Sequence, residues 1–385
     1  MSSTEPPFSV GIEEEYLLVN VDSRDVDENP PQPLLEECTR RSGGQVSPRF
    51  LRCQLEASTP PRASVGEART ELAQLRGIIA EVAGRHGRAP IAASTHPFAK
   101  ATRQITTERE QYFALANEMQ GAARRLMVCG MHVHIGVDDD DLRIDLMNQL
   151  SYFVPHLLAL SCSSPFWEGE RTGLMSFRMT LFNSLPRTGL PERFASFAEL
   201  KRNLAMLTRN GVIEDAGKMW WDVRPNPHHP AVEVRVMDSC TSIDDAAALA
   251  ALIVSLARRL YRLKLQNRSW RIYPNMLIAE NRWRAMRYST DGTLLDLARG
   301  ELVPFAQLVT ELIELAREDA AELGCLRELE HLQTLLARGT SAHRQIRTYE
   351  DARAAGASAR EAMQAVVDFL VRETRGRDEV GAAAG

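Results

Sequence analysis

Residues 10–21 have the sequence VGIEEEYLLVNV, which predicts a β-strand with two chemically different faces. Val, Ile, Leu and Tyr favour an extended backbone, and the polar residues 22–24 end the stretch. Because residues i and i+2 of a strand point to the same side, Glu13 and Glu15 share one face. Glu14 falls on the opposite face, among the apolar side chains. We therefore expect one side of this strand in the core and paired carboxylates on the other.

Three further predicted strands, at residues 50–57, 127–137 and 231–237, divide their side chains in the same way. One face of each is largely apolar, and the other carries charged or metal-binding groups: Gln54 and Glu56, His132 and His134, and Glu233 and Arg235. A solvated sheet face normally shows Lys, Thr and Glu without pattern. Strands that gather ionisable groups on one face instead predict a shared site, where pKa values shift in ways that suit catalysis.

The residue types at this expected site favour a hard divalent cation. The four glutamates of these faces outnumber the two histidines, and oxygen-rich sets prefer Mg²⁺ or Mn²⁺ to zinc. The HVH sequence at 132–134 leaves a zinc pair open as an alternative. Mg²⁺ held by carboxylates is most commonly partnered by nucleotide phosphates. Arg235 and Arg178 would then neutralise phosphate or carboxylate charge.

Strands and helices do not alternate strictly along the chain, which favours an α+β fold with an antiparallel or mixed sheet. We predict one domain over residues 1–375 and a frayed tail at 376–385. The predicted helices are 65–82, 112–126, 142–160, 241–265, 302–315, 326–336 and 358–371, and the remaining predicted strands are 173–181 and 219–224.

Two local features add detail to this arrangement. Residues 22–47 are rich in proline and glycine and are expected to form a long loop, of the kind that often binds a ligand or acts as a lid. Ser242, three residues before Asp245, predicts a capping box at the start of the helix over 241–265.

The overall composition excludes several other classes of protein. The chain has 385 residues and a net charge of −5, and its 46 basic residues are scattered, so nucleic-acid binding is not expected. The N-terminus lacks the pattern of a signal peptide, and the longest nearly apolar run, 246–257, is 12 residues against the ~20 of a membrane span. Six cysteines without a CxxC pair are typical of reduced thiols. We expect a cytoplasmic enzyme without membrane partners.

Six motifs together resemble a known family. GIEEEYLLV, QLEASTP, GMHVHIGV, GLMSFRM, WWDVRPNP and AVEVRVMDSCTS follow one another in the order of the type 2 glutamate–cysteine ligase family. The chain is most similar to the bacterial carboxylate–amine ligase branch, whose fold is similar to that of glutamine synthetase and the guanido kinases. The resemblance runs from about Phe8 into the helical C-terminal third.

The resemblance implies an ATP-dependent ligase in which a curved, largely antiparallel sheet lines a funnel and helices pack on its outer face. By motif, the implied Mg²⁺ ligands are Glu13, Glu15, Glu56, His132 and Glu233. Arg178 and Arg235 are the implied contacts to the substrate carboxylate and the transferred phosphate, with Gln54 and Trp221 as further candidates for substrate or nucleotide binding. His134 stands one step outside the implied ligand position. A homodimer is also implied.

The chemistry of the implied reaction agrees with the residues present. Joining a carboxylate to an amine in water is uphill, so the carboxylate first becomes an acyl phosphate at the expense of ATP. Metal ions and arginines stabilise the dispersed charge of the transferring phosphoryl group, and no nucleophilic Ser or Cys is needed. Glutamate and cysteine are the default substrates, giving γ-glutamylcysteine, ADP and phosphate.

Two departures from the family pattern leave alternatives open. Some relatives carry an acid seven residues before the position of Glu56, where this chain has Arg49, so the metal shell is expected to be thinner or differently completed. The 22–47 loop has no feature that selects cysteine. The alternatives are a zinc-dependent amidohydrolase built on HVH and a catalytically inactive relative that binds nucleotide or amino acid.

Overall fold

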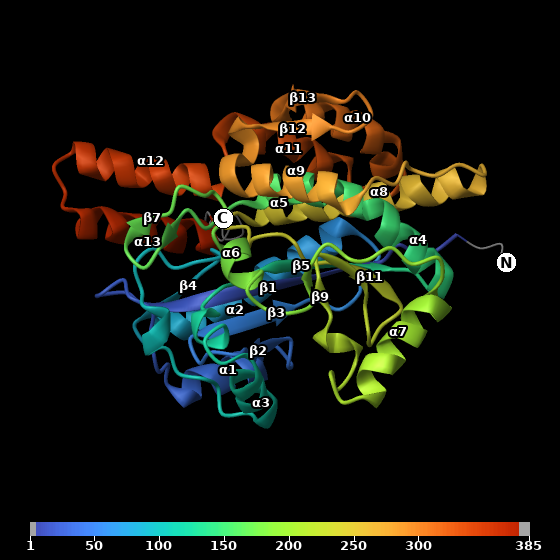
Figure 1. The fold of residues 1–385 in the computed structure, drawn as a ribbon. Helices are drawn as coiled ribbons and strands as arrows, with labels where there is room; N and C mark the ends of the chain where they lie inside the picture. Colours follow the sequence, from blue (N-terminus) through green and yellow to red (C-terminus); the bar gives the residue numbers. More distant parts are fainter. Residues whose placement is uncertain (1–4, 377–385) are drawn as a thin grey trace, which may run out of the picture.

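A seven-stranded antiparallel sheet lies at the centre of the computed structural model, which describes residues 5–376 (Figure 1). Its strand order is β10-β11-β5-β1-β3-β2, and β4 pairs with the far end of β1. The strands are β1 (Val10–Asn20), β2 (Val46–Pro48), β3 (Gln54–Ser58), β4 (Arg88–Ile91), β5 (Met131–Gly136), β10 (Val223–Pro225) and β11 (Ala231–Val234).

The register of this sheet brings the predicted polar residues side by side. Directly opposed residues on neighbouring antiparallel strands share a face and lie close together. Four such pairs are Glu13 with His132, Glu15 with Glu56, Glu233 with His134, and Arg224 with Glu233. We call the face that carries these residues the front face of the sheet.

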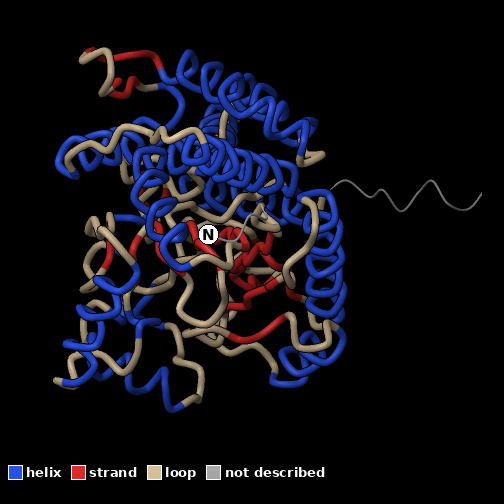
Figure 2. The backbone as a smooth tube through the Cα atoms, turned by 90° about the vertical axis from the view of Figure 1, so that its right-hand side faces the viewer, coloured by secondary structure: helices blue, strands red, loops and turns tan. Residues whose placement is uncertain are grey.

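Helices cover the opposite, rear face. Helices α2 (Val65–Arg85) and α8 (Ile243–Leu265) pack on it, and α8 is buried along most of its length because residues 246–257 are nearly all apolar. α10 (Phe305–Glu322) and α11 (Leu326–Arg338) pack on α8 in turn. Figure 2 shows most of the strands near the centre, with helices above them and along one side. The sheet therefore has a helix-covered rear face, as the apolar strand faces predict.

The remaining elements surround this core. α12 (Ser341–Ala354) and α13 (Ala359–Arg375) pack as a pair, and α13 contacts β4. The other helices are α1 (Gln32–Arg41), α3 (Glu110–Met119), α4 (Asp140–Leu150), α5 (Val154–Ser161), α6 (Arg178–Phe182), α7 (Phe197–Arg209) and α9 (Asn275–Tyr288). Short 3₁₀ turns occur at Ala101–Arg103, Ala123–Arg125, Ser151–Phe153, Ala216–Lys218 and Ser289–Asp291. Two-stranded pairs are β6 (Phe166–Trp167) with β7 (Glu170–Arg171), β8 (Thr188–Gly189) with β9 (Trp220–Trp221), and β12 (Thr293–Asp296) with β13 (Glu301–Pro304).

The predicted α+β class and antiparallel sheet are confirmed, but two segments differ from prediction. The expected loop at 22–47 contains α1, which begins with a proline in its first turn and buries Leu34 and Leu35. Proline is tolerated at that position because the first N–H groups of a helix have no partner within the helix. The expected strand at 173–181 is wrong: α6 begins at Arg178, after a turn.

Smaller differences concern helix boundaries. The helices expected at 112–126 and 142–160 are each interrupted, by a turn after Met119 and by a 3₁₀ turn that begins at Ser151. Ser242 is the N-cap of α8, but its side chain makes no capping hydrogen bond within residues 5–376.

The ends of the chain bear on two further expectations. Residues 377–385 lie outside the described part of the chain, so the tail at 376–385 stays a prediction, as does the single domain at 1–375. Among residues 5–376, no helix combines the length and the apolar character that crossing a bilayer requires.

Candidate active site

Glu13 of β1 stands at the centre of the front face. His132 and His134 of β5 flank it, with Nδ1 of His132 2.9 Å from one carboxylate oxygen and Nε2 of His134 3.2 Å from the other. Because β5 is the antiparallel neighbour of β1, both histidines of HVH point to the side of Glu13. The strand register alone therefore assembles a carboxylate between two imidazoles.

Glu233 of β11 adds a second carboxylate to this group. It is 1% exposed and is held by Arg224, whose guanidinium nitrogens lie 2.9 and 3.3 Å from its two oxygens. Asn226 donates a hydrogen bond of 3.2 Å to it, and Arg235 forms a close ion pair with it. Arg224 and Asn226 were not among the predicted site residues, although Asp222, Arg224 and Asn226 alternate in WWDVRPNP with the period of a strand.

Three of these side chains are arranged to hold a cation. Glu13, His134 and Glu233 offer ligand atoms that all lie within 4.8 Å of one another. Two carboxylates and one imidazole form a donor set that suits Mg²⁺ or Mn²⁺. His132, the histidine named as a ligand from sequence, lies 3.9 Å from Glu233 and is bonded to Glu13, while His134 belongs to the cluster. The residues present therefore fit a divalent cation at this point, which we call the Glu13 corner.

The other two predicted ligands, Glu15 and Glu56, lie together on the same front face, on the side of β1 that pairs with β3. Glu15 and Glu56 are paired across β1 and β3, and Arg49 reaches both. Its nitrogens are 3.2 Å from Glu15 and 3.2–3.3 Å from Glu56. The second oxygen of Glu15 accepts the backbone N–H of Gly130 at 2.8 Å. The predicted ligands thus form two groups rather than one ring.

Burial and neighbouring charge set the protonation of these groups. Burial would raise the pKa of Glu13, but hydrogen bonds with His132 and His134 hold it well below its ordinary value. Burial raises the pKa of Glu56 to about 7, with Arg49 opposing the rise. Burial, together with the charge of Arg235, lowers the pKa of His132 to about 4. His132 is therefore neutral at pH 7 and keeps a lone pair.

Arg178 reaches the front face from α6 rather than from a strand. It is 3% exposed, donates to the carbonyl of Val236 at 3.3 Å and lies 3.5 Å from the carbonyl of Arg235. Gly130 leaves the room it needs, because a Cβ there would lie 3.0 Å from the guanidinium carbon. Burial lowers the pKa of Arg178, and the carboxylate of Asp238, 3.9 Å away, opposes that shift. A cation is thereby held beside the backbone of Arg235.

The other two predicted binding residues have different surroundings. The amide of Gln54 donates to the carbonyls of Leu126 and Val128, and its oxygen accepts the N–H of Leu51. Trp221 is 8% exposed, belongs to the hydrophobic core and packs on a neighbouring aromatic ring. Gln54 thus holds backbone groups and Trp221 is part of the core, and their assignment to a ligand stays a prediction.

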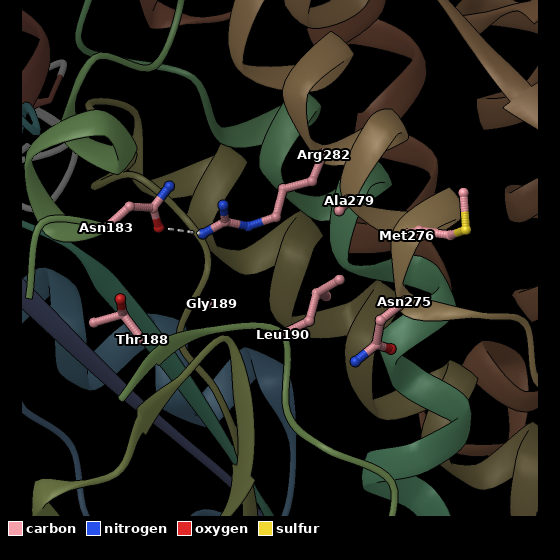
Figure 3. Close-up of a pocket in the computed structure, with 8 residues that line it drawn as sticks. All are labelled: Asn183, Thr188, Gly189, Leu190, Asn275, Met276, Ala279 and Arg282. Carbon is pink, nitrogen blue, oxygen red and sulfur yellow. Dashed lines mark hydrogen bonds between the residues drawn. The ribbon is translucent and has the colours of Figure 1, made fainter. Parts of the chain in front are cut away.

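A hollow of about 390 Å³ lies between residues 183–190 and α9, as Figure 3 shows. Arg282 points across it and donates to Asn183 at 3.0 Å. The same guanidinium forms an ion pair of 2.7 Å with Asp222, which lies between β9 and β10, two residues before Arg224. None of the site residues predicted from sequence lines this hollow among residues 5–376.

Comparison with known proteins places the chain in a family. The model of glutamate–cysteine ligase family 2 matches residues 9–369. Similar proteins from Rhodospirillum rubrum and Paracoccus denitrificans both carry the name “Putative glutamate–cysteine ligase 2”. The first is 52% identical over 374 residues, covering 96% of both chains, and the second is 47% identical over 371 residues, covering 96% of this chain and 98% of the relative.

Two solved structures share the fold at low sequence identity. The crystal structure of glutamate–cysteine ligase from Francisella tularensis in complex with AMP has a TM-score of 0.67 and 15% identity, over 96% of this chain and 89% of that one. A bifunctional glutathione synthetase from Pasteurella multocida has a TM-score of 0.69 and 15% identity, over 95% of this chain and 52% of that one. The chain therefore belongs to glutamate–cysteine ligase family 2, a family of ATP-dependent ligases that form carbon–nitrogen bonds.

Proposed function

We propose that this protein joins L-glutamate to L-cysteine at the expense of ATP, giving γ-glutamylcysteine, ADP and phosphate through an acyl-phosphate intermediate. The observation that carries the proposal is the Glu13 corner, a cation-binding arrangement of Glu13, His134 and Glu233, with Arg235 beside it. Family membership and the fold shared with a glutamate–cysteine ligase support the same reaction.

The Glu13 corner is the place where these residues would hold Mg²⁺, with Mn²⁺ as a substitute. When bound, the ion would offset the negative charge of the ATP phosphates. His132 supports Glu13 through its 2.9 Å contact and stays close enough to Glu233 to serve as a further ligand. Glu15 and Glu56, the other ligands expected from sequence, are already bound to Arg49.

The arginines of the front face would stabilise the charge that develops in the reaction. In the first step, the side-chain carboxylate of glutamate attacks the terminal phosphorus of ATP, and ADP leaves. Arg178 lies 3.5 Å from the backbone carbonyl of Arg235, and the two arginines would orient the carboxylate and stabilise the transferring phosphoryl group. The nitrogen of the amine then attacks the acyl carbon, loses a proton, and releases phosphate.

Several finer points belong to the same proposal. The substrates are amino acids and ATP, the protein works in the cytoplasm, and it acts as a homodimer. Cysteine is the default amine, although the segment at 22–47 has no sequence feature that selects it.

A screen of amino-acid pairs for ADP formation, with mass spectrometry of the products, tests the proposal. We expect ADP release that requires both glutamate and an amine, together with a product of the mass of γ-glutamylcysteine. Nucleotide binding without ADP release for any pair of acid and amine would instead favour the catalytically inactive relative.

Metal analysis tests the zinc-dependent amidohydrolase. Two histidines on one strand are the observation that keeps this reading open. Stoichiometric zinc retained by the purified protein through dialysis would favour it, and a weakly held Mg²⁺ or Mn²⁺ would favour the ligase.

A further inference from the structure

Arg49 occupies the position between Glu15 and Glu56 that a metal ion would take. Its Nε lies 3.2 Å from Glu15, and one terminal nitrogen lies 3.2 and 3.3 Å from the two oxygens of Glu56. The remaining oxygen of Glu15 is bonded to the N–H of Gly130. Three oxygens of this carboxylate pair therefore accept a hydrogen bond, and the fourth, on Glu56, accepts none but lies 3.2 Å from the Arg49 guanidinium.

The backbone fixes this placement of Arg49. The N–H of Arg49 donates to the carbonyl of Gln54 at 3.0 Å, which continues the pairing of β2 with β3. Cross-strand neighbours share a face, and Gln54 shares its face with Glu56, two residues further along. Arg49 is therefore directed onto the front face by the pairing of its own hairpin.

The two carboxylate groups of the front face differ in what surrounds them. The oxygens of Glu13 face two imidazoles, and an imidazole, unlike a guanidinium, can release its proton and offer a lone pair to a cation. Glu15 and Glu56 face a guanidinium, which has no lone pair and keeps its proton in proteins. A divalent ion placed between Glu15 and Glu56 would meet a fixed positive charge that cannot become a ligand.

We propose that Arg49 is a built-in cation, so that Glu15 and Glu56 bind no divalent ion in the nucleotide-free protein. A divalent ion held by protein side chains is confined to the Glu13 corner. This inference rests on the cation site of the proposed function, and it sets how many metal ions the protein itself supplies. Any further ion in the ligase reaction must arrive with the nucleotide.

Counting bound Mn²⁺ tests the inference without any assay of activity. Free Mn²⁺ is measured by electron paramagnetic resonance while the nucleotide-free, full-length protein is titrated. We expect Arg49→Gln to bind one more Mn²⁺ per chain than the wild type, and Arg49→Lys to bind the same number as the wild type. Arg52→Gln is the matched control, because Arg52 is three residues away in sequence and pairs with Glu108 instead.

Glu15→Gln provides a second, independent readout. In the wild-type background it should leave the Mn²⁺ count unchanged, and in the Arg49→Gln background it should remove the gained ion. The inference is overturned if Glu15→Gln removes an ion from the wild type, or if a folded Arg49→Gln protein gains none. Should Arg49→Gln fail to fold, the effect of Glu15→Gln on the wild type still decides. Absence of ligase turnover would contradict the proposed function and leave these counts standing.

Discussion

The three consecutive glutamates of β1 point to two different faces of the sheet. The contacts of the rear face stabilise the fold, whereas the groups of the front face are suited to chemistry. Glu14, on the rear face, is fully buried and receives two nitrogens of Arg76 at 2.8 Å each and the hydroxyl of Tyr16 at 2.5 Å. Arg76 also donates to the carbonyls of Cys240 and Thr241. Glu13, on the front face, keeps 28% of its side chain exposed and faces two histidines.

Because side chains alternate along a strand, β1 contributes to stability with one face and to the candidate site with the other. On the rear face, the buried carboxylate of Glu14 has donors from α2 and β1, and removing Arg76 leaves its charge without compensation. On the front face, the partners of the carboxylate are groups that a cation or a substrate can replace. The rear contacts hold the register that aligns Glu13 with His132.

The largest effect is expected from Arg76→Met, which leaves Glu14 as an uncompensated buried charge. Breaking a buried ion pair in this way costs about 3–5 kcal/mol of the free energy of unfolding. Arg69→Met is the matched control on the same helix, since Arg69 pairs with Asp244 near the surface and should cost no more than about 1 kcal/mol. Urea unfolding measures both. Equal losses in the two variants would show that the rear pair has no special role.

Glu13→Gln tests the front face with an isosteric change. Removing the charge weakens the cation site, so turnover should fall on the order of 10²–10³-fold, as when one electrostatic contact to a transition state is lost. Stability should stay close to that of the wild type. Steady-state ADP formation and urea unfolding are measured on one preparation. Wild-type turnover at ordinary Mg²⁺ would remove Glu13 from the site.

Arg235→Lys separates a substrate contact from a structural arginine. Lysine keeps the charge but loses the planar fork that binds a carboxylate through two hydrogen bonds. Losing one charged hydrogen bond of about 1.5–3 kcal/mol should lower donor-dependent turnover roughly 10–100-fold, with nucleotide binding retained. Reduced melting temperature with normal turnover would assign Arg235 to the structure instead.

The smallest effect extends the comparison to histidines. His96 is fully buried, its Nδ1 accepts the N–H groups of Phe98 and Ala99, and its Nε2 lies 2.9 Å from the carbonyl of Arg24. Burial lowers its pKa to about 3. Since the unfolded chain takes up this proton first, below about pH 6.5, stability is full above that pH and is lost as the pH falls toward 3.

We therefore expect His96 to account for about 1.4 kcal/mol of the loss of stability between pH 7.5 and pH 5.5. His96→Gln lowers stability at both values but should show a shallower dependence on pH. His229→Gln, which removes an exposed histidine, is the control. Parallel pH profiles for the His96 variant and the wild type would contradict the assignment.

Much of the fold and half of the site follow from strand alternation in the sequence. The period of two identifies both faces of β1, β3, β5 and β11, because an apolar face repeated on four strands can be buried on only one side. The same alternation places both histidines of HVH on the front face, but it cannot rank them. His134 enters the Glu13 corner through the register between β5 and β11, which depends on the folded sheet.

The features that could not be predicted from the sequence depend on contacts between segments that are far apart in the chain. Arg76 is 62 residues from Glu14, and nothing local marks them as partners. In the sequence Arg49 is only a departure from the family pattern, and its contact with two carboxylates depends on the pairing of β2 with β3. The prolines near α1 favoured a loop in the sequence, but they precede this helix or lie in its first turn, where proline is tolerated.

The path of one oxygen atom tests the proposed ligase reaction most directly. Glutamate labelled with ¹⁸O in its side-chain carboxylate is incubated with the protein, cysteine, ATP and Mg²⁺, and the released phosphate is analysed by mass spectrometry. An acyl-phosphate intermediate transfers one labelled oxygen from the carboxylate to phosphate for each amide formed, and we predict that result. Unlabelled phosphate released alongside γ-glutamylcysteine would contradict the account.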